Sequence, residues 1–104
     1  MAITDYMKRK LLCQVNEGLH IKRSSDTVDV IVRGIKINGR NKAAALEFKG
    51  NTKCREIYLS RSDGLWELAN GISIGVGSEK TTPNKISLHY ELYREYAAEK
   101  RKYE

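Results

Sequence analysis

Basic side chains concentrate in the middle of the chain, where Lys and Arg could neutralise the phosphates of a nucleic acid. Between residues 33 and 61 the sequence holds eight basic residues and only two acidic ones, Glu47 and Glu56. Residues 1–61 carry a net charge of +7 and residues 62–104 a net charge of −1, within a total of +6. The candidate phosphate-binding residues are Arg33, Lys36, Arg40, Lys42, Lys49, Lys53, Arg55 and Arg61.

Two aromatic rings lie close to this basic segment in the sequence. Tyr58 and Trp66 could stack on unpaired bases, as flat side chains do in proteins that bind single strands. Alternation in a regular strand would give two faces, one with Lys53, Arg55, Ile57, Leu59 and Arg61, the other with Cys54, Glu56, Tyr58 and Ser60. The competing interpretation is a basic surface that only maintains solubility, with Trp66 in the core.

The tyrosines form a second candidate site. The chain has six Tyr and one Phe, and Tyr90, Tyr93 and Tyr96 recur at three-residue spacing. On a helix this stripe would be either a core-facing seam or a protein-binding surface, because Tyr adds contact area with little side-chain entropy to lose. We expect these three residues at a protein interface.

A phosphate-binding loop is disfavoured in the glycine-rich segment 71–77. Ser78 and Glu79 separate the last glycine from Lys80, and Glu79 would put negative charge beside a bound anion. The cysteines and histidines also lack the short-spaced pairs of structural zinc sites; they are Cys13, Cys54, His20 and His89. We expect no metal and no cofactor. We also expect no enzyme, with a metal-free ribonuclease toxin as the minority alternative.

The composition is that of a globular domain, with 40% hydrophobic and 31% charged residues over 104 positions. This length favours one domain, residues 1–104. No apolar run approaches the ~18 residues of a membrane span, and the sequence shows no secretory signal. We therefore expect a cytoplasmic protein.

The first segment has helical spacing. Thr4 and Asp5 resemble an N-cap and a first-turn acid, and apolar residues recur from Tyr6 onward at three- and four-residue intervals. Gly18 is suited to end a helix. The pattern predicts a helix over about residues 4–17.

The clearest strand is predicted over residues 27–37, which are rich in Val and Ile. Apolar residues alternate on one face before Gly34 and on the other face after it, so a bulge at Gly34 would return both sets to the core. Asn38-Gly39 predicts a hairpin turn, and residues 43–49 predict the returning strand rather than a short helix.

A meander of short strands is predicted next, at residues 55–61, 65–68 and 72–76, followed by a polar loop over 77–85. Residues 86–88 alternate like a strand, and residues 90–102 then have helical spacing; one helix from Pro83 is the alternative. The expected fold is α+β: an N-terminal helix, an antiparallel meander of about five strands and a C-terminal amphipathic helix.

The last part of the chain resembles, in its order of elements, the single-strand-DNA-binding coactivator family, whose curved sheet is followed by a helix. The resemblance rests on the final meander, in which Ile86-Ser87-Leu88 leads toward a helix near Glu91. It covers roughly the last fifty residues and implies a fold, without assigning any binding residue.

These features predict a small, basic, non-enzymatic protein that binds DNA or RNA through backbone contacts from a basic sheet face. The alternative is a small protein-binding inhibitor or adaptor, of the kind that phages and mobile elements encode. It would block or redirect a host protein through an acidic partner surface. An exposed strand edge or the tyrosine stripe would also allow a homodimer.

Overall fold

Antiparallel strands account for most of the chain in the computed structural model, which describes residues 6–39, 41–82 and 84–104. The strands are β1 (Tyr6–Gln14), β2 (Glu17–Arg23), β3 (Asp26–Asn38), β4 (Asn41–Gly50), β5 (Glu56–Ser60), β6 (Trp66–Ala69), β7 (Ile72–Thr82), β8 (Lys85–Tyr93) and β9 (Ala97–Lys102). A single turn of 3-10 helix, η1 (Arg61–Asp63), follows β5. Among the described residues, no helix has the length and apolar character needed to cross a membrane.

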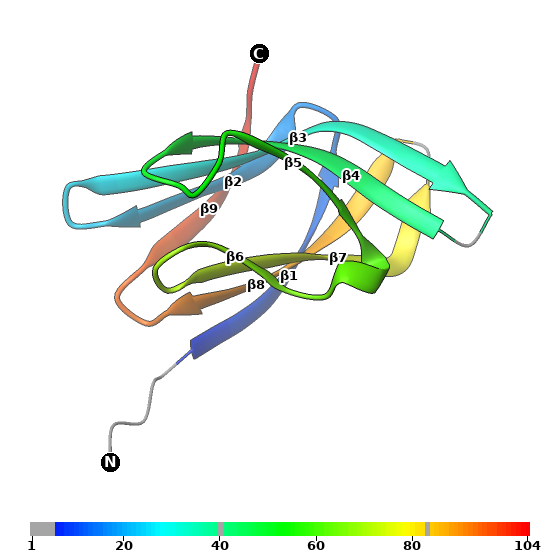
Figure 1. Cartoon of the computed structure of the whole chain (residues 1–104). Coiled ribbons are helices and arrows are strands. Elements are labelled where there is room, and N and C mark those ends of the chain that lie inside the picture. Colours follow the sequence, from blue (N-terminus) through cyan, green and yellow to red (C-terminus); the bar gives the residue numbers. More distant parts are fainter. Residues whose placement is uncertain (1–5, 40, 83) are drawn as a thin grey trace.

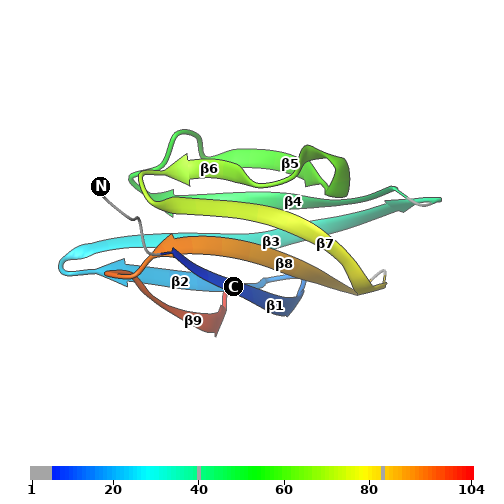
Figure 2. The same cartoon turned by 90° about the horizontal axis from the view of Figure 1, so that it is seen from below.

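The strands form two sheets that pack face to face, as Figure 1 and Figure 2 show. The four-stranded sheet has the order β1-β8-β7-β6, and the five-stranded sheet has the order β5-β4-β3-β2-β9. Consecutive strands β2 to β5 and β6 to β8 therefore make two meanders. The terminal strands cross between the sheets, because β1 pairs with β8 and β9 pairs with β2. This exchange connects the two sheets at both ends of the chain.

The core lies between the sheets and consists of the side chains that alternate inward. Its largest members are fully buried: Leu19, Ile21, Leu46 and Leu59 from the five-stranded sheet, with Leu68, Ile72, Ile74, Ile86, Leu88 and Leu92 from the other. Each such side chain stabilises the fold by about 1.5–3 kcal/mol relative to an exposed one. Ile31 is also fully buried but lies outside this core cluster.

The predicted N-terminal helix is wrong, because its residues form β1 and the beginning of β2. Met7, Leu11 and Cys13 fit the two-residue period of a strand as well as helical spacing, and all three contact the core. Since β1 is an edge strand, its basic residues remain exposed without cost to the sheet. The predicted cap at Thr4 lies outside the described residues.

The predicted C-terminal helix is also wrong, as is the alternative helix from Pro83. β8 continues to Tyr93, Arg94 and Glu95 form a turn, and the chain returns as β9. A three-residue spacing places Tyr90 and Tyr93 on opposite faces of a strand, so the tyrosines do not share one face as they would on a helix. The α+β class is therefore replaced by an all-β fold, without the helix that the coactivator resemblance implied.

The central strands are confirmed, and so is the bulge. The register between β3 and β4 shifts between Val32 and Gly34, which brings Ile35 opposite the buried Ala44 and onto the core side. The hairpin turn after Asn38 is also present, with Gly39 in a left-handed conformation (φ 63°). The polar loop predicted over residues 77–85 is wrong, since β7 extends to Thr82.

Candidate nucleic-acid interface

Strands β3, β4 and β5 present a flat outer surface, on the side of the five-stranded sheet that faces away from the core. Two rows of residues cross it from strand to strand. Gly34, Ala45 and Tyr58 form one row, and Lys36, Ala43 and Ser60 form the next. We call these six residues the Tyr58 face. Its centre consists of the small residues Gly34, Ala43 and Ala45. Their side chains project little or nothing above the backbone, so this part of the face is low.

The Tyr58 ring stands above this flat surface and is the most exposed large hydrophobic side chain that the structure describes, at 66%. Its neighbours on β5, Ile57 and Leu59, point toward the core. Lys36 places its Nζ 5.6 Å from the centre of the Tyr58 ring, which is within the range of a cation–π contact. The ring and the ammonium group together offer a stacking surface beside a positive charge.

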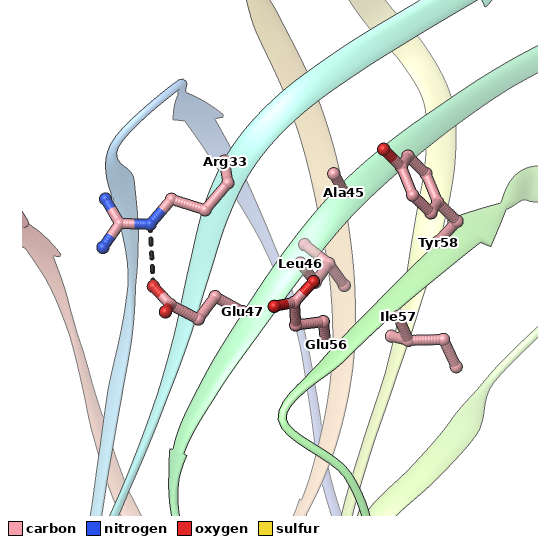
Figure 3. A pocket seen from close by; sticks show the side chains of 7 residues that line it. All are labelled: Arg33, Ala45, Leu46, Glu47, Glu56, Ile57 and Tyr58. Carbon is pink, nitrogen blue, oxygen red and sulfur yellow. Dashed lines mark hydrogen bonds and ion pairs between the residues drawn. The ribbon is translucent and has the colours of Figure 1, made fainter.

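A shallow groove of about 500 Å³ lies next to Tyr58, and Figure 3 shows its lining. Ala45 forms its floor, Tyr58 stands on one side, and the charged walls are Arg33, Glu47 and Glu56. The Glu47 carboxylate accepts a hydrogen bond from Arg33 Nε at 2.8 Å. In the described part of the chain, the Glu56 carboxylate has no hydrogen-bond or ion-pair partner. The groove therefore contains two carboxylates: Glu47, which is hydrogen-bonded to Arg33, and Glu56, which can accept hydrogen bonds from a ligand.

Arg33, the first of the predicted phosphate-binding residues, is occupied by contacts within the protein. It is the extra residue of the β3 bulge. Besides Glu47, its guanidinium donates to Asn16 Oδ1 at 2.9 Å and to the Glu104 carbonyl oxygen at 3.1 Å. Arg33 thus ties β3 and β4 to the turn after β1 and to the end of the chain, and these contacts occupy its Nε and Nη1 donors.

The remaining basic candidates do not gather on one face. Lys36 and Lys49 both lie on the outer side of the five-stranded sheet, Lys49 opposite Asp29. Lys42 belongs to the core side near the hairpin turn, opposite Ile37. Arg61 lies in η1 and lines a hollow over the four-stranded sheet, with Gly75, Gly77 and His89. Arg40 lies outside the described residues.

The strand face proposed for Lys53, Arg55 and Arg61 does not form, because β5 begins only at Glu56 and ends at Ser60. Lys53 pairs instead with Glu67 of β6 at 3.1 Å. The other predicted face is present in part: Glu56, Tyr58 and Ser60 alternate outward, each opposite an outward residue of β4, whereas Cys54 lies before β5 and packs against the core. The sequence alternation therefore identified the exposed ring correctly, but not the cations around it.

Trp66 is not available as a stacking platform. Its ring stacks on Phe48 with centroids 5.7 Å apart and planes 13° from parallel, and it packs against the core. This is the core placement weighed as the alternative from the sequence. Of the two predicted base-stacking rings, only Tyr58 is free to stack on a ligand.

The three tyrosines predicted at a protein interface all lie in the core or pack against it. Tyr90 packs against the core, which raises its pKa through desolvation. Tyr93 is half-buried, with its ring against Gly71 and 5.2 Å from the ring of Tyr6. Tyr96 is 8% exposed and donates to the Asn70 carbonyl at 2.8 Å. They do not form the single surface that a helix would have given.

Metal binding and Cys13 thiol chemistry, two possibilities considered from the sequence, are not supported by the described residues. No cluster of three His, Cys, Asp or Glu side chains suited to a metal is found there. Cys13 is fully buried, and desolvation raises its thiol pKa to about 11, which makes it a poor nucleophile. These observations leave the Tyr58 face and its groove as the candidate site.

Sequence reasoning missed Gly34, Ala43, Ala45 and Glu56 as members of this site. The outward position of Glu56 followed from the same alternation that exposed Tyr58, but its negative charge argued against a phosphate-binding role. The small residues carried no chemical signal of their own. No family model, no curated protein and no solved structure matches this chain, so the proposals that follow rest on its own geometry and chemistry.

Proposed function

We propose that this protein is a non-enzymatic nucleic-acid-binding module that holds a single strand of DNA or RNA on the Tyr58 face. The observation that carries the proposal is the exposed Tyr58 ring, flanked by Lys36 on a flat floor of small residues. A base can stack on the exposed part of this ring, while the Lys36 ammonium lies over the ring 5.6 Å from its centre. Stacking of this kind contributes about 1–3 kcal/mol per base and tolerates any base, because every base has a π face.

The basic residues of the outer surface fit a strand that runs along β4. Lys36 lies opposite Ala43 near one end of that surface, and Lys49 lies in β4 near the other end. Six residues of extended strand separate their positions along β4, which is about 20 Å. The Tyr58 row crosses between them, so phosphates could be contacted on both sides of a stacked base. The overall charge of +6 would strengthen the attraction at low salt.

The proposal is tested by measuring the binding of fluorescently labelled dT and rU oligonucleotides to the full chain. We expect binding at about 50 mM salt that weakens linearly in a log–log plot as salt rises. Tyr58→Ala should weaken binding about tenfold, and Tyr58→Phe, which keeps the ring, should retain it. Lys36→Gln should reduce the magnitude of the slope of log affinity against log salt concentration by about 1, because one phosphate contact is lost.

The absence of binding to both oligonucleotides at about 50 mM salt would overturn the proposal. So would equal binding by the parent chain and Tyr58→Ala, because the site would then lie elsewhere. Since Tyr58 is largely exposed, its replacement should leave folding intact, and circular dichroism of each variant provides the control.

A second candidate function, binding of a protein partner, is favoured by β1. This nine-residue strand forms one edge of the four-stranded sheet, and Tyr6 and Leu12 are exposed on it. An edge strand can pair with an extended segment of another protein. A complex that survives nuclease treatment, and that is lost when a proline is placed in β1 without unfolding the protein, would support this function. Loss of all bound material after nuclease treatment would instead favour nucleic-acid binding.

A further inference from the structure

We infer that the groove beside Tyr58 takes a guanine base, whose Watson–Crick edge donates its N1–H and N2–H bonds to the Glu56 carboxylate. This inference rests on the proposed function and adds a base preference to it. It starts from a feature that a purely phosphate-binding surface does not need: the Glu56 carboxylate, which has no partner among the described residues, lines the groove beside the exposed Tyr58 ring.

The order of the groups along β5 fits a nucleotide. Glu56, Tyr58 and Ser60 point outward in turn, about 7 Å apart, as alternate residues of a strand do. Lys36 lies on the Ser60 side of Tyr58, since Lys36 and Ser60 both stand opposite Ala43. The surface therefore presents a carboxylate, then a ring, then an ammonium group. A nucleotide carries hydrogen-bond donors or acceptors at one end of its base and a phosphate beyond the other.

Glu56 is available for a ligand, whereas Glu47 is not. The two residues stand directly opposite each other on β5 and β4. Arg33 neutralises Glu47 and holds it against β3, as Figure 3 shows. Placing like charges opposite each other on neighbouring strands is unfavourable. The Glu56 charge therefore opposes folding slightly, and hydrogen bonds donated by a ligand would offset part of this cost by stabilising the carboxylate.

Guanine is the base whose edge matches an ionised carboxylate. A carboxylate only accepts hydrogen bonds, and its two oxygens can accept two parallel ones. Guanine offers two adjacent donors on its Watson–Crick edge. Adenine and cytosine each place a ring-nitrogen acceptor next to their amino group, and uracil and thymine place carbonyl oxygens on both sides of their N–H. These acceptors would face the carboxylate and be repelled.

The competing ligand, an Arg or Lys side chain of a protein partner, fits the groove less well. Such a cation would also pair with Glu56 and approach the Tyr58 ring. That ring already has the Lys36 ammonium at 5.6 Å, and Arg33 forms the opposite wall of the groove. A further cation would meet repulsion from the Lys36 ammonium, whereas the Arg33 charge is already paired with Glu47. Guanine is neutral, and its attached phosphate is attracted to Lys36, so the mixed charges of the groove favour the nucleotide.

The test compares three labelled oligonucleotides of equal length: dT only, dT with one central dG, and dT with one central deoxyinosine. We expect the dG oligonucleotide to bind about tenfold more tightly than dT, the discrimination of one good bidentate contact. Inosine lacks the N2 amino group and should recover only part of this gain. Glu56→Gln should abolish the preference for dG while keeping or increasing the affinity for dT, because a negative charge is removed.

The matched control is Glu95→Gln, which makes the same change in net charge at an exposed site that pairs with Arg23, away from the groove. It should keep the dG preference. Equal affinity for dG and dT, or a dG preference that persists in Glu56→Gln, would overturn the inference while leaving the proposed function in place. Failure of all three oligonucleotides to bind would overturn the proposed function itself.

Discussion

The outer surface of the five-stranded sheet has two halves, which differ in how far their polar side chains are hydrogen-bonded to other groups of the protein. In the half formed by β2, β9 and the beginning of β3, side chains bind one another and the end of the chain covers the sheet. We call this the closed half. In the half formed by β3, β4 and β5, which carries the Tyr58 face, Arg33 pairs with Glu47, but Tyr58 is exposed and the Glu56 carboxylate has no partner among the described residues. Both halves belong to one continuous sheet, and they differ in the side-chain pairs on its surface and in the chain-end contacts of the closed half.

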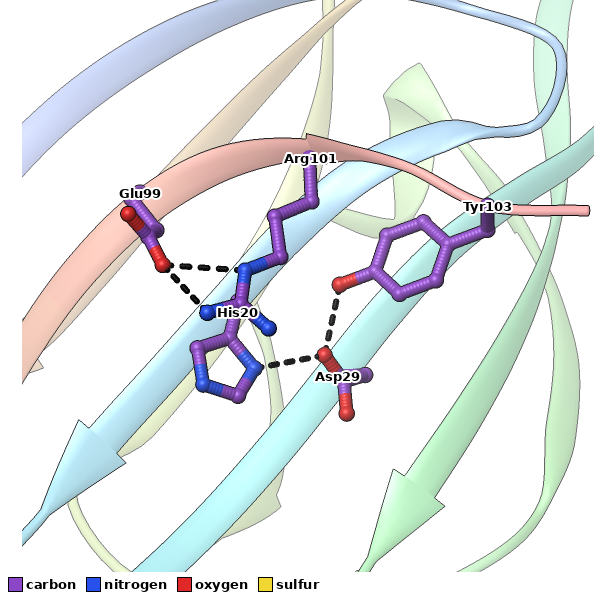
Figure 4. A network of polar contacts seen from close by, with 5 residues as sticks. All are labelled: His20, Asp29, Glu99, Arg101 and Tyr103. Carbon is purple, nitrogen blue, oxygen red and sulfur yellow. Dashed lines mark hydrogen bonds and ion pairs between the residues drawn. The ribbon is translucent and has the colours of Figure 1, made fainter.

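A network centred on Asp29 holds the closed half together, as Figure 4 shows. His20 Nδ1 lies 2.8 Å from Asp29 Oδ1, and the Tyr103 hydroxyl donates to the same oxygen. The Tyr103 amide also donates to the Asn16 carbonyl at 2.7 Å, which extends the pairing beyond β9. Ile31, fully buried although outside the core, lies opposite Gly18 on this side of the sheet. The closed half is therefore a second, smaller packed layer.

The comparison separates residues that stabilise the protein from residues that are free to bind. Replacing a closed-half residue should lower the free energy of unfolding, because its partners lie within the chain. Replacing a residue of the Tyr58 face should change binding and leave that free energy nearly constant. The predictions below measure this contrast with matched substitutions in the two halves.

The largest difference is expected between two glycines. A Cβ at Gly18 would overlap the Val30 carbonyl oxygen and lie 2.9 Å from Ile31 Cα, so β2 and β3 would have to separate. Gly18→Ala should lower the free energy of unfolding by about 3 kcal/mol, at the upper end of typical overpacking costs. A Cβ at Gly34 would make an ordinary contact with Ala45 Cβ at 3.6 Å. Gly34→Ala should be neutral or stabilising by about 0.5 kcal/mol.

Urea denaturation of both variants measures these values. Equal losses of stability at the two positions would contradict the division of the surface into a packed half and an open half.

A smaller difference is expected between two tyrosine hydroxyls. Tyr103→Phe removes the hydrogen bond to Asp29 and should cost about 1 kcal/mol, whereas Tyr58→Phe should cost nothing measurable. Thermal and urea unfolding of the two variants provide the comparison. A measurable loss in Tyr58→Phe would show that the Tyr58 hydroxyl has a structural role and would weaken its assignment to ligand binding.

The same network predicts a pH dependence. Desolvation and the hydrogen bond to Asp29 raise the pKa of Tyr103 above its ordinary value of 10.0. The unfolded chain therefore loses this proton at a lower pH than the folded chain, and the stability contributed by Tyr103 is lost as pH rises above about 10. The stability difference between the parent chain and Tyr103→Phe should be constant below pH 9 and should narrow above pH 10. A difference that widens in this range would refute the network.

The smallest effect is expected at the facing carboxylates. Glu56→Gln relieves the like-charge contact with Glu47 and should stabilise the fold by about 0.3 kcal/mol, the low end for cross-strand pairs. Glu47→Gln weakens the bond to Arg33 and should destabilise it by up to about 1 kcal/mol. Urea denaturation measures the change in the free energy of unfolding for both variants. Changes of opposite sign would support the inference that Glu47 stabilises the fold, whereas Glu56 is available to bind a ligand.

The strands that sequence patterns predicted correctly are those with a single consistent reading. In residues 27–37 and 72–76 β-branched residues alternate and turn residues follow them, so local preference and tertiary structure agree; residues 43–49 were compatible with a short helix and were assigned from the turns on either side. The first and last segments were predicted incorrectly because their apolar residues satisfy both periods. Met7 and Leu11 are four residues apart, which places them on one face of a helix and also on one face of a strand. Pairing with β8 decided between the two.

By itself, the sequence determined the strong central strands, the bulge at Gly34 and the placement of Tyr58 on the strand face opposite Ile57 and Leu59, because each depends on near neighbours in the chain. Only the tertiary structure decided which cations stand beside that ring. Lys36 reaches Tyr58, Arg33 is bound to Glu47, and Trp66 is stacked on Phe48, all through residues that are distant in sequence. Cross-strand register sets these contacts, and register depends on how the whole sheet packs rather than on any local pattern.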